Sequence, residues 1–467
     1  MSDNKLQTSS SDTGNPMRWV VLGVTFAAAL GIDSLMTYIS GSDDMFYFSL
    51  ARESPGLFGF LAGYLNEMQD GRIATAASLW LVFSNNIWLW RICNAVVITL
   101  FCFLVSKIAC LIAGEKQSLL MPQVFVCASL AIINSFAIAA SMFTVSFSLH
   151  YLWACTAGLL ALYYPVKEAF CPEENKAGVL PYCLMAASVY VCLAQEQAAA
   201  VVVAFLLIIT IYRHIEYKKQ MRGNGEVGVE ARKPLFLYIQ TALSLAFFLL
   251  NLSQAMVDRP YYATSYGSHH VLIALQWLVY NYIVYAKYVL IFLWGMLFLR
   301  FTRKKQPVFS VLCALFAATA LLSVFLPAFA DAGLFAGEVS FLAKRDQEIP
   351  ALSLSVVQGI VLIWWLFAVG VTPLLLLKAL KEEPMRYAAP LLYLAGGACA
   401  CLITATNIMY TTMGRTFFIT AILLVMIVAS LIPSSIKKPK HMLLAACVFV
   451  LFATAQLRES FLILISS

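Results

Sequence analysis

Residues 17–39 read MRWVVLGVTFAAALGIDSLMTYI, and this stretch decides the fold class. Its side chains are almost all apolar, and a helix of this length crosses a hydrocarbon core of about 30 Å. The run is too long for the apolar part of a cleavable signal peptide, so we expect it to persist as the first membrane helix. Apolar runs of similar length recur to the end of the chain.

The composition of the whole chain indicates the same class. Of the 467 residues, 61% are hydrophobic and 12% are charged, and the mean hydropathy is +0.82. Soluble domains carry about 25% charged residues, so this chain cannot cover itself with polar groups and must face lipid. Because helices satisfy their own backbone hydrogen bonds in lipid, the sequence predicts an all-α, polytopic integral membrane protein.

The apolar runs divide the chain into two regions. Residues 1–16 are polar and are predicted to form a disordered cytoplasmic tail. Residues 17–467 are predicted to form a single polytopic membrane domain with about 11 to 13 transmembrane helices. The expected spans are 17–39, 87–112, 120–140, 147–165, 178–194, 197–213, 235–256, 271–299, 308–329, 352–377, 389–410, 416–433 and 442–457.

Basic residues set the predicted orientation, because Lys and Arg accumulate in cytoplasmic loops. With the tail in the cytoplasm, most of the 31 Lys and Arg residues fall inside, including dense clusters at 213–222, 300–305 and 437–440. The net charge of +7 then reflects anchoring to anionic membrane lipids. No nucleic-acid-binding motif is present, and no nucleic-acid partner is expected.

In this orientation, a set of polar residues lies at the outer ends of helices or in outer loops. Charge near lipid is costly unless it is paired or functional, so we expect one outward-facing polar cavity to gather them. The set comprises Asp43, Asp44, Asp70, Arg72, His150, Glu196, Asp258, Arg259 and Arg415.

The first outer loop, residues 40–86, is the candidate catalytic loop. Within it, 54–69 combines Pro and Gly with Phe and Leu and is predicted to be an interfacial or re-entrant helix. Residues 73–85 extend it along the surface, and the double Asn85-Asn86 predicts a break there. The loop opens with SDDMFYF. Ser42 or Asp43 can cap a helix. Alternatively, one of Asp43 and Asp44 acts as a general base while the other orients it or holds a divalent cation.

The loop closes with YLNEMQDGR. Arg72 either anchors lipid headgroups or offers a fork of donors to a phosphate. Asp70 is its partner or a capping residue. Farther along, Glu196 lies in CLAQEQ between two apolar stretches, where it marks either a plain polar turn or the outer mouth of the cavity.

Two further arginines, Arg259 and Arg415, lie at predicted outer helix ends beside hydroxyls and aromatic rings. Together with Arg72 they would neutralise a phosphate leaving group in a site shielded from water. Tyr261 and its neighbours either stack on a sugar face or are ordinary interfacial tyrosines.

Templates for other chemistries are missing from the sequence. It contains no P-loop, dinucleotide-binding glycine turn, nucleophile elbow or HExxH motif. Most of the 12 cysteines lie inside apolar runs, and the five histidines do not have zinc-ligand spacing. The sequence points to no particular cofactor, and a divalent cation stays open. Asp43 and Asp44 are compatible with Mg²⁺ or Mn²⁺ but do not demand either.

Several motifs resemble those of polytopic GT-C glycosyltransferases. The bacterial O-antigen glucosyltransferase family and a related GT-C-like family show an Asp-Asp pair after the first helix, then an aromatic-rich segment ending in Gly-Arg. SDDMFYF and YLNEMQDGR are similar to these motifs. HYLW at 150–153 resembles an Asn-Tyr-x-Trp segment, AQEQ an acidic mid-chain turn, and MGRTFF a late Gly-Arg.

The resemblance implies a GT-C-like fold in the bacterial cytoplasmic (inner) membrane, with the active site on the outer face. It implies sugar transfer with inversion from a polyprenyl-phosphate donor to a lipid-linked or cell-surface glycan acceptor. Asp43 or Asp44 would deprotonate the acceptor hydroxyl, and Arg72, Arg259 and Arg415 would hold the donor phosphate. The remaining site residues would bind sugar or acceptor: Asp70, His150, Glu196 and Tyr261.

Two other classes remain open. A flippase or transporter of a lipid-linked saccharide would use the same outer cavity, but charges should then also line a path to the cytoplasm. A glycan polymerase or ligase would show a large outer loop, and the longest candidate, 331–350, is modest.

Overall fold

The computed structural model describes residues 16–38, 43–68, 72–114, 119–132, 139–171, 178–193, 195–222, 234–258, 275, 278–279, 282–331, 356–402, 417–436 and 444–449. All regular structure in these residues is helical. The prediction of an all-α protein is therefore confirmed for the described part of the chain. The elements are α1 (Pro16–Leu35), α2 (Asp43–Glu53), α3 (Leu57–Met68), α4 (Ile73–Phe83), α5 (Ile87–Ile112), α6 (Leu120–Ile132), η2 (Ala139–Phe143), α8 (Val145–Ser148), η3 (Leu149–Trp153), α9 (Ala154–Phe170), α10 (Val179–Ala187), α11 (Val189–Cys192), α12 (Glu196–Arg222), α13 (Leu235–Asp258), η7 (Tyr282–Ala286), α15 (Lys287–Arg303), α16 (Pro307–Asp331), α18 (Val356–Ala379), η8 (Pro384–Arg386), α19 (Ala388–Leu402) and α20 (Phe418–Ser435).

Eight helices of the described chain are long and apolar enough to cross a membrane. They confirm a multi-pass membrane protein, and shorter apolar helices cover 73–83, 120–131, 179–192 and 235–251. The predicted number of transmembrane helices, 11 to 13, stays a prediction. The break expected at Asn85-Asn86 is present, because Asn86 caps α5 by accepting the N–H of Trp88.

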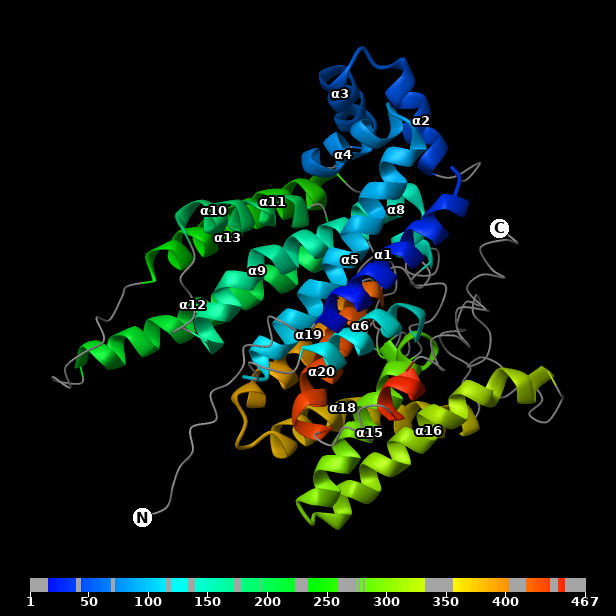
Figure 1. Cartoon of the computed structure of the whole chain (residues 1–467), viewed down its shortest axis with the longest axis vertical. Coiled ribbons are helices and arrows are strands. Elements are labelled where there is room, and N and C mark those ends of the chain that lie inside the picture. The colour runs from blue at the N-terminus through cyan, green and yellow to red at the C-terminus, as the bar shows by residue number, and fades with distance from the viewer. Residues whose placement is uncertain are drawn as a thin grey trace.

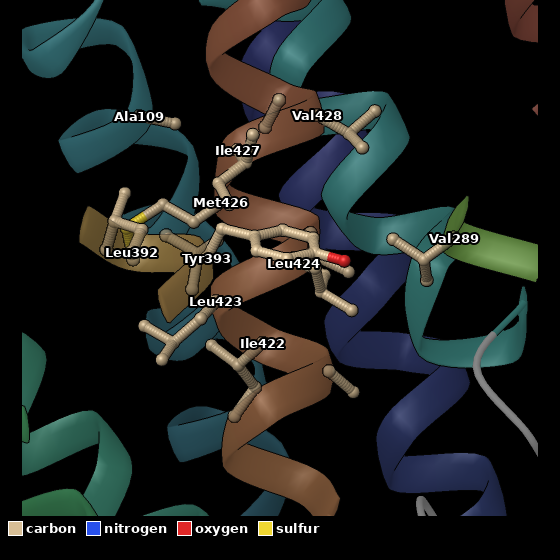
Figure 2. Close-up of a cluster of buried hydrophobic side chains, with 14 of the residues drawn as sticks. Ala109, Val289, Leu392, Tyr393, Ile422, Leu423, Leu424, Met426, Ile427 and Val428 are labelled. Atoms are coloured by element: carbon tan, nitrogen blue, oxygen red, sulfur yellow. The ribbon is translucent and has the colours of Figure 1, made fainter. Parts of the chain in front are cut away.

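Helix α20 forms the centre of the bundle, and almost every side chain from Phe418 to Ser435 is buried. Its sequence is apolar on all sides, which is typical of a helix surrounded by other helices. Figure 2 shows Ile422, Leu424 and Val428 of α20 in a cluster with Ala109 of α5 and Val289 of α15. Its few polar side chains are hydrogen-bonded, as Thr420 is to the Gly396 carbonyl and Ser430 to the Ile427 carbonyl, so α20 can pack against partners all around.

The two ends of the bundle differ in charge. At one end, Gly114 lies against Pro384, and Arg300 bonds Glu383 and Ser435. The N-terminal turn of α1 joins this end, because the Gln123 side chain donates to the Arg18 carbonyl at 3.1 Å. We call this the basic end, and its residues are Arg18, Arg300, Arg303, Lys304, Lys305, Lys378, Lys381 and Arg386. All of them belong to the predicted inner set.

At the other end, α2, α3 and α4 form a small lobe beyond the start of α5 (Figure 1). The lobe has its own apolar cluster, in which Tyr47, Phe60, Tyr64, Leu79 and Phe83 are buried. Arg91 ties the end of α1 to α5 by donating to the Met36 carbonyl at 2.7 Å. The residues of the predicted outer loop that the structure describes therefore lie opposite the basic end.

Candidate functional site

The first turn of α2 separates the two adjacent aspartates. Asp43 is exposed, whereas Asp44 is 1% exposed. Consecutive helical residues point about 100° apart, so the two carboxylates cannot face the same neighbours. Both carboxylates are in the first turn, where negative charge is favoured by the helix dipole.

Asp44 joins α2 to the irregular segment that precedes α9. Its Oδ1 accepts the backbone N–H of Ser146 at 2.9 Å. Ser146 lies in the single turn α8, between the π-helices η2 and η3. The first N–H groups of a helix have no acceptor within it, so this donor is available to a side chain of another element.

His150 is hydrogen-bonded to the carbonyl group of Ser146, the residue whose N–H Asp44 accepts. Its Nδ1 lies 2.8 Å from the Ser146 carbonyl oxygen, and because a carbonyl only accepts, Nδ1 carries the proton. In the neutral ring, Nε2 is then an acceptor. The ring stacks on Tyr47, with centroids 6.2 Å apart. The backbone N–H and carbonyl of Ser146, which belong to two successive peptide groups, thus hold a carboxylate and an imidazole near one residue.

Aromatic rings surround this pair. Trp90 donates its indole N–H to Ser148 Oγ at 2.9 Å, and Tyr38 stacks on Phe83 at 5.2 Å. Burial, and secondarily the negative charge of Asp44, raise the pKa of the Tyr38 hydroxyl. Tyr38 therefore stays neutral near neutral pH.

Arg72 and Glu196 form an ion pair across 124 positions of sequence. Arg72 Nη2 donates to Glu196 Oε1 at 2.6 Å, and the two side chains are 17% and 26% exposed. Arg72 precedes α4 and Glu196 opens α12. The structure thus brings these two predicted site residues together. The structure assigns Arg72 a carboxylate partner that the sequence did not identify.

One apolar cluster contains residues close in sequence to Asp44, Arg72 and His150. Tyr47, one turn after Asp44, belongs to it, as do Ala76, one turn after Arg72, and Leu149, next to His150. The cluster thus connects the start of α2, the start of α4 and η3. A rigid apolar base under polar residues limits their motion relative to one another.

A third polar group lies deeper and was missed from the sequence. Asp33 of α1 is fully buried and accepts two bonds from Asn94 Nδ2, at 3.1 and 3.2 Å. Asn94 also donates to the Met142 carbonyl and accepts the indole N–H of Trp153. The available signal was an acid inside an apolar run, which rarely occurs without a partner.

Four predicted site residues lie outside the described part of the chain: Asp70, Arg259, Tyr261 and Arg415. Among the side chains that the structure describes, no three His, Cys, Asp or Glu residues gather as metal ligands. Asp43 and Asp44 lie on different faces of α2, so the pair by itself is a poor chelate for a divalent cation.

No protein-family model, curated protein or solved structure matches the sequence. The resemblance to GT-C glycosyltransferases therefore depends on the short motifs, and the function has to be argued from the geometry of the site.

Proposed function

We propose that the chain is a membrane glycosyltransferase of GT-C type that transfers a sugar from a polyprenyl-phosphate donor to a glycan acceptor. Its site lies on the outer face of the bacterial cytoplasmic membrane. The observation that carries this proposal is the gathering of Asp44, His150, Arg72 and Glu196 at the end of the bundle opposite the basic end. Basic residues mark the cytoplasmic side, so these groups face outward.

Transfer needs a base for the acceptor hydroxyl. We assign this role to Asp43, because its carboxylate is exposed and a base must come within hydrogen-bond reach of the proton that it removes. The acceptor oxygen attacks the anomeric carbon as its proton passes to Asp43. The bond from that carbon to the phosphate oxygen breaks on the opposite face, so the configuration inverts.

Asp44 is a positioning residue in this scheme. It accepts the Ser146 N–H and thereby fixes the first turn of α2, and with it Asp43, against α8. His150 presents an acceptor nitrogen to a sugar hydroxyl when its ring is neutral.

The departing polyprenyl phosphate carries the negative charge. Arg72 neutralises this charge, since a planar guanidinium matches phosphate oxygens better than an ammonium does. Glu196 holds Arg72 in place before the donor arrives. Donor phosphate then competes with Glu196 for the same guanidinium.

The test uses purified protein in liposomes with a radiolabelled polyprenyl-phosphate sugar and a glycan acceptor. We expect Asp43→Asn to lose about 10²- to 10⁴-fold in transfer rate, the usual contribution of a general base. The matched control is Glu53→Gln, an exposed acid of the same helix, which should keep wild-type transfer. Wild-type transfer by Asp43→Asn would remove the base assignment.

The same assay distinguishes a glycosyltransferase from a flippase. A flippase would move labelled lipid across the bilayer without forming product, and Asp43→Asn would then leave that movement unchanged.

A further inference from the structure

A groove lies at the basic end, between α15 and residues 444–449. The groove has a volume of about 540 Å³ and runs along α15 from Ile291 to Arg303, a rise of about 18 Å. Its volume falls in the range of small-molecule pockets, about 300–1,000 Å³. Figure 1 shows residues 444–449, in red, beside α15. The groove belongs to the opposite end of the bundle from Asp44.

The lining of the groove is mostly apolar. Phe292 and Phe449 line it with ring centroids 5.1 Å apart, and Phe125 packs against both at 5.7 and 4.8 Å. Met296 and Leu299 continue the lining toward the basic end. An apolar chain is the ligand that such a lining favours.

The groove has empty space beside Gly295, near the middle of its length along α15. Gly295 lines it, and a Cβ added there would meet no atom within 4 Å. A larger side chain at this position would therefore project into the empty space without displacing a neighbour.

The mouth of the groove is polar and cationic. Arg303, the one charged lining residue, is exposed and forms no ion pair among the described residues. Arg300, one turn earlier, is already neutralised by Glu383 and bonds Ser435 Oγ at 2.9 Å. Lys304 and Lys305 follow Arg303 directly. The mouth thus carries uncompensated positive charge next to an apolar slot.

We propose that this groove binds an anionic phospholipid from the leaflet at the basic end. One acyl chain lies along α15 past Gly295, and the phosphate contacts Arg303. The net negative head distinguishes this lipid from a zwitterionic one, because the mouth is cationic. The proposal does not depend on the sugar-transfer function and concerns a different end of the molecule.

The test uses full-length protein in detergent with a phosphatidylglycerol analogue that carries a photoreactive diazirine in its acyl chain. We expect labelled peptides to cover residues 291–299 and 444–449. Gly295→Phe, which fills the groove, should reduce this labelling at least tenfold. The matched control is Gly370→Phe on the exposed side of α18, where an added Cβ also meets nothing within 4 Å, and it should label as wild type.

A separate variant tests the contact between Arg303 and the phosphate of the lipid. Arg303→Gln should reduce the preference for phosphatidylglycerol over phosphatidylcholine about fivefold, the value expected for one cation near an anionic surface. Lys381→Gln, an exposed cation of the same end, should leave the preference unchanged. If Gly295→Phe does not fold, Gly295→Leu serves the same purpose.

Three results would overturn the proposal. Equal labelling of the Gly295→Phe and Gly370→Phe proteins would exclude lipid from the groove. Equal preference in the Arg303→Gln and Lys381→Gln proteins would remove the head contact. A dimer that Gly295→Phe abolishes, without lipid labelling in the wild type, would make the groove an interface between two copies.

Discussion

At the scale of single residues, the two aspartates of SDDMFYF have the same chemistry and different surroundings. Asp43 is exposed, and Asp44 is buried with a backbone N–H as its donor. A buried donor left without an acceptor costs about 1–3 kcal/mol. This difference allows a base and a positioning residue to be told apart by experiment.

We predict that Asp44→Ala lowers the free energy of unfolding by about 1–3 kcal/mol, because the Ser146 N–H loses its acceptor. Asp44→Asn keeps an oxygen there and should recover most of the stability and most of the transfer. Thermal unfolding in detergent and the transfer rate measure the two effects. If Asp44→Asn were fully stable but inactive, Asp44 would be the base and the present assignment would be reversed.

The Arg72–Glu196 pair supplies the second prediction at this scale. Glu196→Gln retains an acceptor for Arg72 but removes the charge that competes with the donor phosphate. We expect the KM for the donor to fall several-fold with little change in kcat, since charge-assisted hydrogen bonds are about twice as strong as neutral ones. Steady-state kinetics with varied donor gives both constants. A rise in KM would show that the Glu196 charge helps to bind the donor.

At the scale of elements, the end of α5 has a specific backbone requirement. Gly114 adopts φ +69° just after the helix, and a Cβ there would lie 3.0 Å from Pro384 Cγ. Glycine occupies this left-handed region without the steric cost that other residues bear. The turn brings the end of α5 against η8 at the basic end.

We predict that Gly114→Ala destabilises the protein by about 1–2 kcal/mol, the usual cost of a left-handed conformation for an L-residue. Gly23→Ala is the control, because Gly23 lies within α1 with nothing within 4 Å of an added Cβ. That change should be neutral or should stabilise by up to about 1 kcal/mol. Thermal unfolding of the two purified variants compares them, and equal stability would show that the turn relaxes.

At the scale of the whole molecule, the bundle has two chemically different ends. The α2–α4 lobe and the Arg72–Glu196 pair occupy one end, and the basic residues around Arg300 occupy the other. A membrane protein with this distribution is oriented by its basic end.

We predict that single cysteines introduced for Glu53 and Lys305 react with a membrane-impermeant maleimide from opposite sides of the membrane. The residue 53 site should label in intact cells, and the residue 305 site only after the membrane is opened. A cysteine placed for Arg415, outside the described residues, should label like residue 53. Labelling of positions 53 and 415 from opposite sides would end the proposed function.

Some features of this protein are visible in the sequence alone. Apolar runs, charge and loop composition are sums over neighbouring residues, so they predicted the helical membrane class, the break before Asn86 and the segregation of Arg300 and its neighbours from Asp44.

Only the tertiary structure decided which polar groups meet. The Asp44–Ser146 and Arg72–Glu196 contacts join residues 102 and 124 positions apart, and Asn94 reaches Asp33 from a different helix. Such pairings depend on how helices pack against one another, and helix packing is fixed by side-chain shape rather than by local pattern. The sequence therefore determined that the chain is a helical membrane protein. The packing of its helices determined which polar side chains contact one another.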